Sequence, residues 1–260
     1  NLIPDINLTP YSIWLATVVV SGISYLSYLL KRYVFHESGT LVSGIIGGLY
    51  SSTATISVLA RKSRKASEQE ATEYVAAMLL AISMMFLRFM ILILIFSREI
   101  FLSIYPYLLT MAVVAAIVAW FIHSRQKRPE DQPAETEEDD SSNPLEFKVA
   151  LIFAVLFVIF TFLTHYTLVY AGTGGLNLLS FVSGFSDITP FILNLLQNTG
   201  SVAALIITAC SMQAIISNIM VNMFYALFFA GKGSKLRPWI LGGFGVVIAC
   251  NLVLLLFFYI

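Results

Sequence analysis

The sequence predicts an all-α integral membrane protein with six transmembrane helices and two re-entrant helical hairpins in two inverted repeats. The first supporting observation is composition: of the 260 residues, 58% are hydrophobic and only 12% are charged. Average soluble domains are about 45–50% apolar and about 25% charged, so an ordinary soluble domain and a disordered chain are both excluded. The other two observations are the lengths of the apolar segments and the interruptions in two of them.

Six segments are long enough to cross a bilayer, since a spanning helix needs about 20 mostly apolar residues. The last but one of them is unusually long and carries more polar residues, which predicts a tilted or extended helix. The six segments are residues 11–30, 74–96, 101–122, 149–170, 201–230 and 239–260.

Residues 39–60 and 175–196 are also apolar, but glycine and small hydroxyl residues interrupt each of them near its middle. Non-helical backbone inside a membrane is tolerated only where protein or a cavity surrounds it. Each segment is therefore either a broken spanning helix or a re-entrant hairpin whose two arms each reach about 15 Å into the membrane.

The distribution of basic residues favours the hairpins. If both segments enter and leave on one side, every one of the 15 basic residues except Arg88 and Arg98 becomes cytoplasmic, as the positive-inside rule prefers. If both segments span, the basic residues divide almost evenly. The preferred arrangement has both termini outside and four cytoplasmic segments, which are residues 31–38, 61–73, 125–147 and 231–238.

An internal repeat accompanies this order of elements. Gly48–Thr53 aligns with Gly184–Thr189, and each half reads as span, hairpin, span, span. The predicted units are a first repeat, residues 1–124, a charged and disordered linker, residues 125–147, and a second repeat, residues 148–260. Because the halves start on opposite sides, they are predicted to be inverted repeats whose hairpin tips meet at mid-membrane, a recurrent transporter design.

Small hydroxyl residues mark the first predicted tip. Serine and threonine cap helix N-termini, whose free N–H groups suit an anion, while carbonyls freed before them suit a small cation. The alternative is simple capping combined with close packing at Gly44-x-x-x-Gly48. The candidate binding residues here are Gly48, Ser51, Ser52, Thr53 and Thr55.

The second tip contains Asp187, the only acidic residue within an apolar segment, and Arg88 is the only basic one. Ionisable residues inside a membrane are functional candidates by default; the alternatives are helix capping by Asp187 and a static Arg88–Asp187 ion pair. The candidate binding residues of this tip are Gly184, Ser186, Asp187 and Thr189. Arg88, Asn218 and Asn222 are predicted to set charge or line the site, with interhelical hydrogen bonding as the alternative for the two asparagines.

Other classes of function have little support in the sequence. It carries no Walker A, HExxH or GxSxG motif and no paired-cysteine metal site, so we expect neither an enzyme nor a cofactor. The balance of 15 basic and 15 acidic residues gives no basic patch for nucleic acid. No residue pattern assigns a metal.

Several motifs together resemble the uncharacterised membrane domain at the C-terminus of MgtC/SapB-type bacterial membrane proteins. They are GGLYSSTATISVLARKSRK followed by MMFLR, the opening TPYSIWLATVVVSGISYLSY, and the later GFSDIT and SNIMVN. The resemblance covers essentially the whole chain and implies a bacterial inner-membrane protein with an MgtC-like domain upstream. The chain departs from the pattern at Thr189, where relatives tend to have a second acid, and at Asn222, where they tend to have lysine.

The leading functional hypothesis is a transporter that moves an ion or small solute by alternating access, with its site between the two hairpin tips. A regulatory or scaffold membrane domain without transport is the second hypothesis, and an ion channel whose filter is formed by the tips is the third. The expected partners are the lipid bilayer and the transported ion or solute. An apolar perimeter on so small a protein is also compatible with a homodimer.

Overall fold

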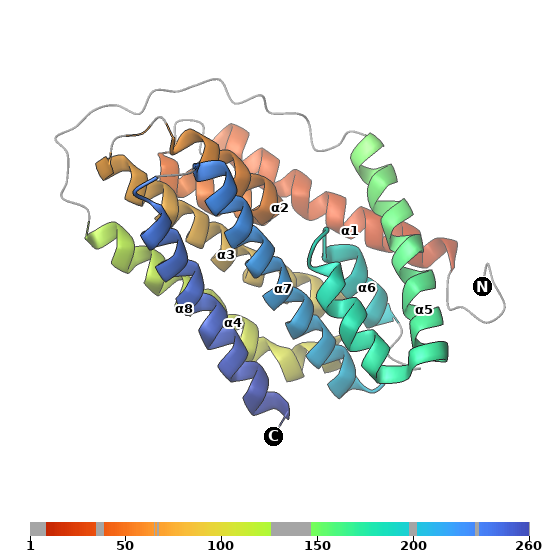
Figure 1. The fold of residues 1–260 in the computed structure, drawn as a ribbon. Helices are drawn as coiled ribbons and strands as arrows, with labels where there is room; N and C mark the ends of the chain where they lie inside the picture. Colours follow the sequence, from red (N-terminus) through yellow and green to blue (C-terminus); the bar gives the residue numbers. More distant parts are fainter. Residues whose placement is uncertain are drawn as a thin grey trace.

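The computed structural model describes residues 9–34, 39–64, 66, 68–125, 147–197, 202–231 and 234–259. These residues form eight α-helices and one π-helical turn, with no β-strand among them (Figure 1). In chain order they are α1 (Pro10–Leu29), η1 (Leu30–Val34), α2 (Thr40–Lys62), α3 (Glu68–Phe96), α4 (Arg98–Ser124), α5 (Phe147–Ser183), α6 (Thr189–Gln197), α7 (Ala204–Ala230) and α8 (Arg237–Tyr259).

Seven of these helices, all except the short α6, are long and apolar enough to cross a membrane. Large apolar side chains cover the outside of the bundle; Trp120, Tyr170 and Phe257 are each at least 70% exposed. Such a surface would be unstable in water and suits lipid. The all-α membrane prediction is therefore confirmed. The predicted linker, apart from Arg125 and Phe147, lies outside the described residues.

Helix α2 is broken at its centre. Ser51 has extended backbone angles, φ −157° and ψ 107°. A Cβ on Gly47 would collide with the Thr55 side chain, although eight residues of straight helix would separate the two positions by about 12 Å. The chain therefore turns back at Ser51 and forms two short arms, residues 40–50 and 52–62.

Helix α5 also reverses direction. The break is at Gly172, whose φ of 59° lies in the region that favours glycine. Gly175 then lies close to the side chain of Thr167. In Figure 1 α5 runs to a turn and returns as a shorter arm toward α6. Residues 173–183 and α6 thus form a second pair of arms, joined by residues 184–188, which we call the second tip.

Helices α3 and α7 form the centre of the bundle. In their most apolar stretches, α3 is 56% buried and α7 is 72% buried inside the protein. Helix α3 packs against α2 and α4, while α7 packs against α5, α8 and α2. The central position of these two helices explains why the polar side chains they carry are enclosed rather than exposed to lipid.

Two glycines allow the first arm of α2 to lie directly on α3. A Cβ on Gly44 would collide with the backbone of Ala77, and a Cβ on Gly48 would lie 2.5 Å from the Cα of Ala81. Both contacts advance by four residues, so the arm and α3 run parallel. Small residues permit such close approach between membrane helices, and the contact fixes the depth that the arm reaches.

The ends of the helices define the two ends of the bundle. Arg64, just after α2, donates to the backbone carbonyls of Phe228 and Phe229 at the end of α7. Gln197 at the end of α6 donates through Nε2 to the carbonyl of Ser12, 3.3 Å away, near the start of α1. Helix α7 starts a few residues after Gln197 and runs about 40 Å to Ala230, so these two contacts lie at opposite ends.

Candidate functional site

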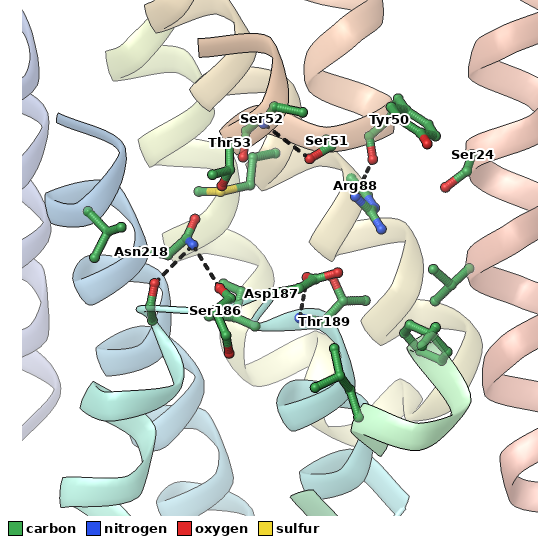
Figure 2. Close-up of a pocket in the computed structure, with 18 of the residues that line it drawn as sticks. Ser24, Tyr50, Ser51, Ser52, Thr53, Arg88, Ser186, Asp187, Thr189 and Asn218 are labelled. Carbon is green, nitrogen blue, oxygen red and sulfur yellow. Dashed lines mark hydrogen bonds between the residues drawn. The ribbon is translucent and has the colours of Figure 1, made fainter. Parts of the chain in front are cut away.

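The breaks in α2 and after α5 open onto one cavity of about 690 Å³ (Figure 2). Residues 50–54 of α2 and 184–189 of the second tip and α6 both line it. Helices α1, α3, α5 and α7 complete its walls. Of the residues that the sequence marked as candidates, the cavity is lined by Ser51, Ser52, Thr53, Arg88, Gly184, Ser186, Asp187, Thr189 and Asn218.

Ser51 caps the second arm of α2. Its side-chain Oγ accepts a hydrogen bond of 3.3 Å from the backbone N–H of Ala54, the position that a capping serine serves. Ser52 and Thr53 follow in the first turn of the arm, and both line the cavity. The N-terminal end of a half-helix, with its partial positive charge, therefore faces the cavity.

Asp187 caps the N-terminus of α6. Its Oδ1 accepts a hydrogen bond of 2.9 Å from the backbone N–H of Thr189, the first residue of α6. The capping alternative for Asp187 is thus present in the structure. The carboxylate is nevertheless exposed to the cavity rather than enclosed, so capping leaves it free to act on a bound solute as well.

Asn218 of α7 holds the second tip from behind. Its Nδ2 donates to the carbonyl of Gly184 at 3.2 Å and toward that of Ser186 at 3.5 Å. Ser217 donates through Oγ to the carbonyl of Phe181 at 2.6 Å. A Cβ on Gly184 would collide with the Ser217 side chain, so only glycine lets the tip lie against α7.

Arg88 is the central charged residue of the cavity. It is only 8% exposed, and its Nη1 donates a hydrogen bond of 2.7 Å to the carbonyl of Tyr50. Its Nε–H is buried and has no acceptor among the described residues. The guanidinium and the Asp187 carboxylate face the same space in Figure 2. The described residues give them no ion pair, so the predicted static pair is not formed.

Three candidates support the site without lining the cavity. Gly48 packs on Ala81, and Thr55 lies beside Gly47 across the break in α2. Asn222 donates through Nδ2 to Oδ1 of Asn218, 3.0 Å away. Because that oxygen is engaged by Asn222, the Asn218 amide presents its N–H₂ group to the tip. Asn222 therefore orients Asn218 through a bond within α7. The interhelical alternative is seen at Asn218 itself, which donates to the carbonyl of Gly184.

Residues that the sequence did not single out also reach the cavity. Ser21 and Ser24 of α1, Tyr50 before the break, and Tyr225 of α7 all line it. Ser21 and Ser24 lie three residues apart on one face of α1, and this spacing could have marked them from the sequence. The two tyrosines carried no such signal, because aromatic residues are frequent throughout this chain.

Within the described residues no group of three histidine, cysteine, aspartate or glutamate side chains lies close enough to hold a metal ion. The polar groups that line the cavity are one guanidinium, one carboxylate, one carboxamide, several hydroxyls and the N-terminal ends of two half-helices. That set can bind and release a small polar solute.

Comparison with known proteins adds no activity to this description. The profile of the family described as "Domain of unknown function (DUF4010)" matches residues 18–230. An uncharacterized protein of Aquifex aeolicus (strain VF5) is 24% identical over 224 residues, which cover 85% of this chain and 96% of that protein. No solved structure matches the chain.

Proposed function

We propose that this chain, which belongs to the DUF4010 family of domains of unknown function, transports an ion or small solute across the membrane by alternating access. The observation that carries the proposal is the cavity that the break in α2 and the second tip share. Interrupted helices that meet within the bundle are a recurrent design of secondary transporters, where half-helix ends bind the solute. The proposal also includes the two features that the resemblance implies, a location in the bacterial inner membrane and an MgtC-like domain upstream.

The proposed topology has two re-entrant hairpins, namely α2 and the segment from residue 173 to the end of α6. For α2, the hairpin is supported by the contact of Arg64 with the end of α7, because this contact locates the end of α2 at the same end of the bundle as the end of α7. The first arm of α2 runs parallel to α3 from the end where α3 begins, which supports a hairpin with both ends of α2 at that end of the bundle. The positive-inside rule then makes this end cytoplasmic.

The second hairpin has the opposite orientation in this proposal. Its first arm starts at the Gly172 turn, and its second arm ends at Gln197, beside the start of α1. One hairpin would then enter from each side, and the two tips would meet at mid-membrane. Inverted repeats of this kind allow one half to rock against the other around a fixed site.

Transport is tested with the purified chain in proteoliposomes. Uptake of labelled inorganic ions, small organic acids and small amines is measured for the wild type, Asp187→Asn and Ser52→Ala. Matched controls are Glu99→Gln and Ser103→Ala, which change exposed residues of α4 outside the cavity. We expect uptake of at least one solute that both cavity variants reduce and both controls retain.

Three results would contradict the proposal in different ways. Uptake that is unchanged in both cavity variants would reject the site. Currents far above carrier turnover would indicate a channel. Failure to move any of these solutes, together with stoichiometric recovery of a membrane partner protein, would favour the regulatory or scaffold function.

A further inference from the structure

We infer that the solute class of this cavity is a small planar oxyanion, a carboxylate or an inorganic anion of similar shape, bound by Arg88 between the ends of two half-helices. The inference rests on the proposed function for its site, but it concerns binding and is tested separately. Three observations carry it: the free donors of Arg88, the two helix N-termini, and the carbonyls that protein donors already occupy.

Arg88 has a donor that nothing in the described chain satisfies. The side chain is buried, with only 8% of the residue exposed. Its Nε–H lacks an acceptor among the described residues, and its Nη1 donates only to a neutral carbonyl. A buried charge without a partner is costly. The guanidinium presents its N–H groups in a flat fork that matches two oxygens of a carboxylate or similar oxyanion. An anion in the cavity would meet both needs.

The helix ends add positive potential to the same cavity. The N-terminus of the second arm of α2, at Ser52, and that of α6, at Thr189, both line it. Each carries a partial charge of about +0.5. Together with Arg88 they exceed the single negative charge of Asp187 by about one unit, by the same approximation. This excess matches one monovalent anion.

A cation would compete with protein donors for its natural ligands. The carbonyls freed by the two breaks are the features that bind small cations in interrupted helices. Here Arg88 donates to the carbonyl of Tyr50, and Asn218 donates to those of Gly184 and Ser186. The guanidinium beside these carbonyls repels a cation, whereas the freed N–H ends of the two half-helices attract an anion.

Asp187 has a defined part in this inference. It caps α6 through Oδ1, and its charge lies within electrostatic range of Arg88. Its negative charge would therefore weaken the binding of the anion and assist its release. Removing that charge should tighten anion binding, whereas removing it from a cation site would abolish binding. The sign of the change in affinity separates the two classes of solute.

The test measures equilibrium binding to the purified full chain in detergent, without any transport. The thermal midpoint is titrated with sodium nitrate, sodium acetate and sodium propionate against sodium chloride at equal ionic strength. Replacing sodium by choline at constant anion reports any cation site. Nitrate against the two carboxylates distinguishes an inorganic from an organic source of the oxyanion.

We expect a saturable rise of the midpoint with at least one planar anion and none on exchanging sodium for choline. Arg88→Gln should weaken the apparent affinity at least about 10-fold, since a hydrogen bond to a charged group contributes about 1.5–3 kcal/mol. Asp187→Asn, which keeps a side-chain oxygen for the cap, should strengthen the affinity several-fold. Glu99→Gln, which removes a carboxylate outside the cavity, should leave the affinity unchanged.

The inference is overturned if Asp187→Asn abolishes binding, if sodium but no anion shifts the midpoint, or if Arg88→Gln binds as the wild type does. Should Arg88→Gln fail to fold, the sign of the Asp187→Asn change still decides. Anion binding without uptake in proteoliposomes would sustain the inference and reject transport. Uptake of a cation without anion binding would sustain transport and reject the inference.

Discussion

Nη1 of Arg88 donates a 2.7 Å hydrogen bond to the carbonyl of Tyr50, the residue immediately before the break in α2 at Ser51. This bond connects the central helix α3 to the last residue of the first arm, which lines the cavity. The Nε–H of the same guanidinium is buried and has no acceptor among the described residues. A solute bound to this guanidinium would therefore be linked to the position of the first tip through one side chain.

The first prediction concerns the shape of the cation at position 88. Arg88→Lys retains the charge but has one compact ammonium group, which cannot hold Tyr50 and a solute in a flat fork. Loss of one charge-assisted hydrogen bond, about 1.5–3 kcal/mol, should reduce uptake about 10-fold or more. The measurement is initial uptake in proteoliposomes at equal amounts of inserted protein. Wild-type uptake by Arg88→Lys would mean that only the charge matters.

The second prediction concerns the support of the second tip. Asn218→Ala removes the donor to the carbonyls of Gly184 and Ser186, and leaving a buried acceptor unsatisfied costs about 1–3 kcal/mol. We expect a lower thermal midpoint and lower uptake. Asn222→Ala removes only the bond that orients the Asn218 amide, so its effects should be smaller. Equal effects of the two variants would show that orientation, rather than the direct bond, holds the tip.

The third prediction tests the contact between α2 and α3. Gly48→Ala places a Cβ 2.5 Å from the Cα of Ala81, and overpacking of this kind costs about 1–3 kcal/mol. Its midpoint in detergent should fall. The matched control is Gly22→Ala in α1, where a Cβ meets nothing within 4 Å and alanine improves helix propensity by up to about 1 kcal/mol. A fall of equal size in both variants would assign the effect to backbone flexibility instead of packing.

The fourth prediction tests the cap at the end of α7. Arg64 donates to the carbonyls of Phe228 and Phe229, two of the acceptors that every helix C-terminus leaves open. Arg64→Gln should lower stability by about 0.5–1.5 kcal/mol and speed amide hydrogen exchange in the residues that follow α7. Arg98→Gln, at an exposed arginine in the first turn of α4, serves as the control. Unchanged exchange after Arg64→Gln would remove the assigned role of the cap.

Sequence reasoning located the long apolar helices and the first break because both leave local signals. The glycine and hydroxyl residues around Ser51 mark a place where helix is weak, and the structure breaks there. The tip at residues 184–188 was found from the same kind of signal. The reversal at Gly172 lies between the predicted span, residues 149–170, and the predicted hairpin, residues 175–196.

The partners of Arg88 could not be predicted from the sequence. Its hydrogen-bond acceptor is the backbone carbonyl of Tyr50. Every residue has such a carbonyl, so the amino-acid sequence does not show which carbonyl accepts the bond. Asp187 was the only acidic residue available in an apolar segment, and pairing it with Arg88 was therefore the natural expectation. The cap at Thr189 engages that carboxylate instead, which is a tertiary outcome of how the second tip lies.

The last prediction concerns which faces of the membrane the ends of the two broken segments reach. In a cysteine-free background, with Cys210 and Cys250 replaced, single cysteines are placed at Thr40 and Lys62, the ends of α2, and at Thr173 and Gln197, the ends of the second pair of arms. A membrane-impermeant maleimide is applied to intact cells before and after permeabilisation. Re-entrant hairpins predict that Thr40 and Lys62 share one face while Thr173 and Gln197 share the other. Labelling of Thr40 and Lys62 from opposite faces would make α2 a spanning helix, and the two halves would then be parallel rather than inverted repeats.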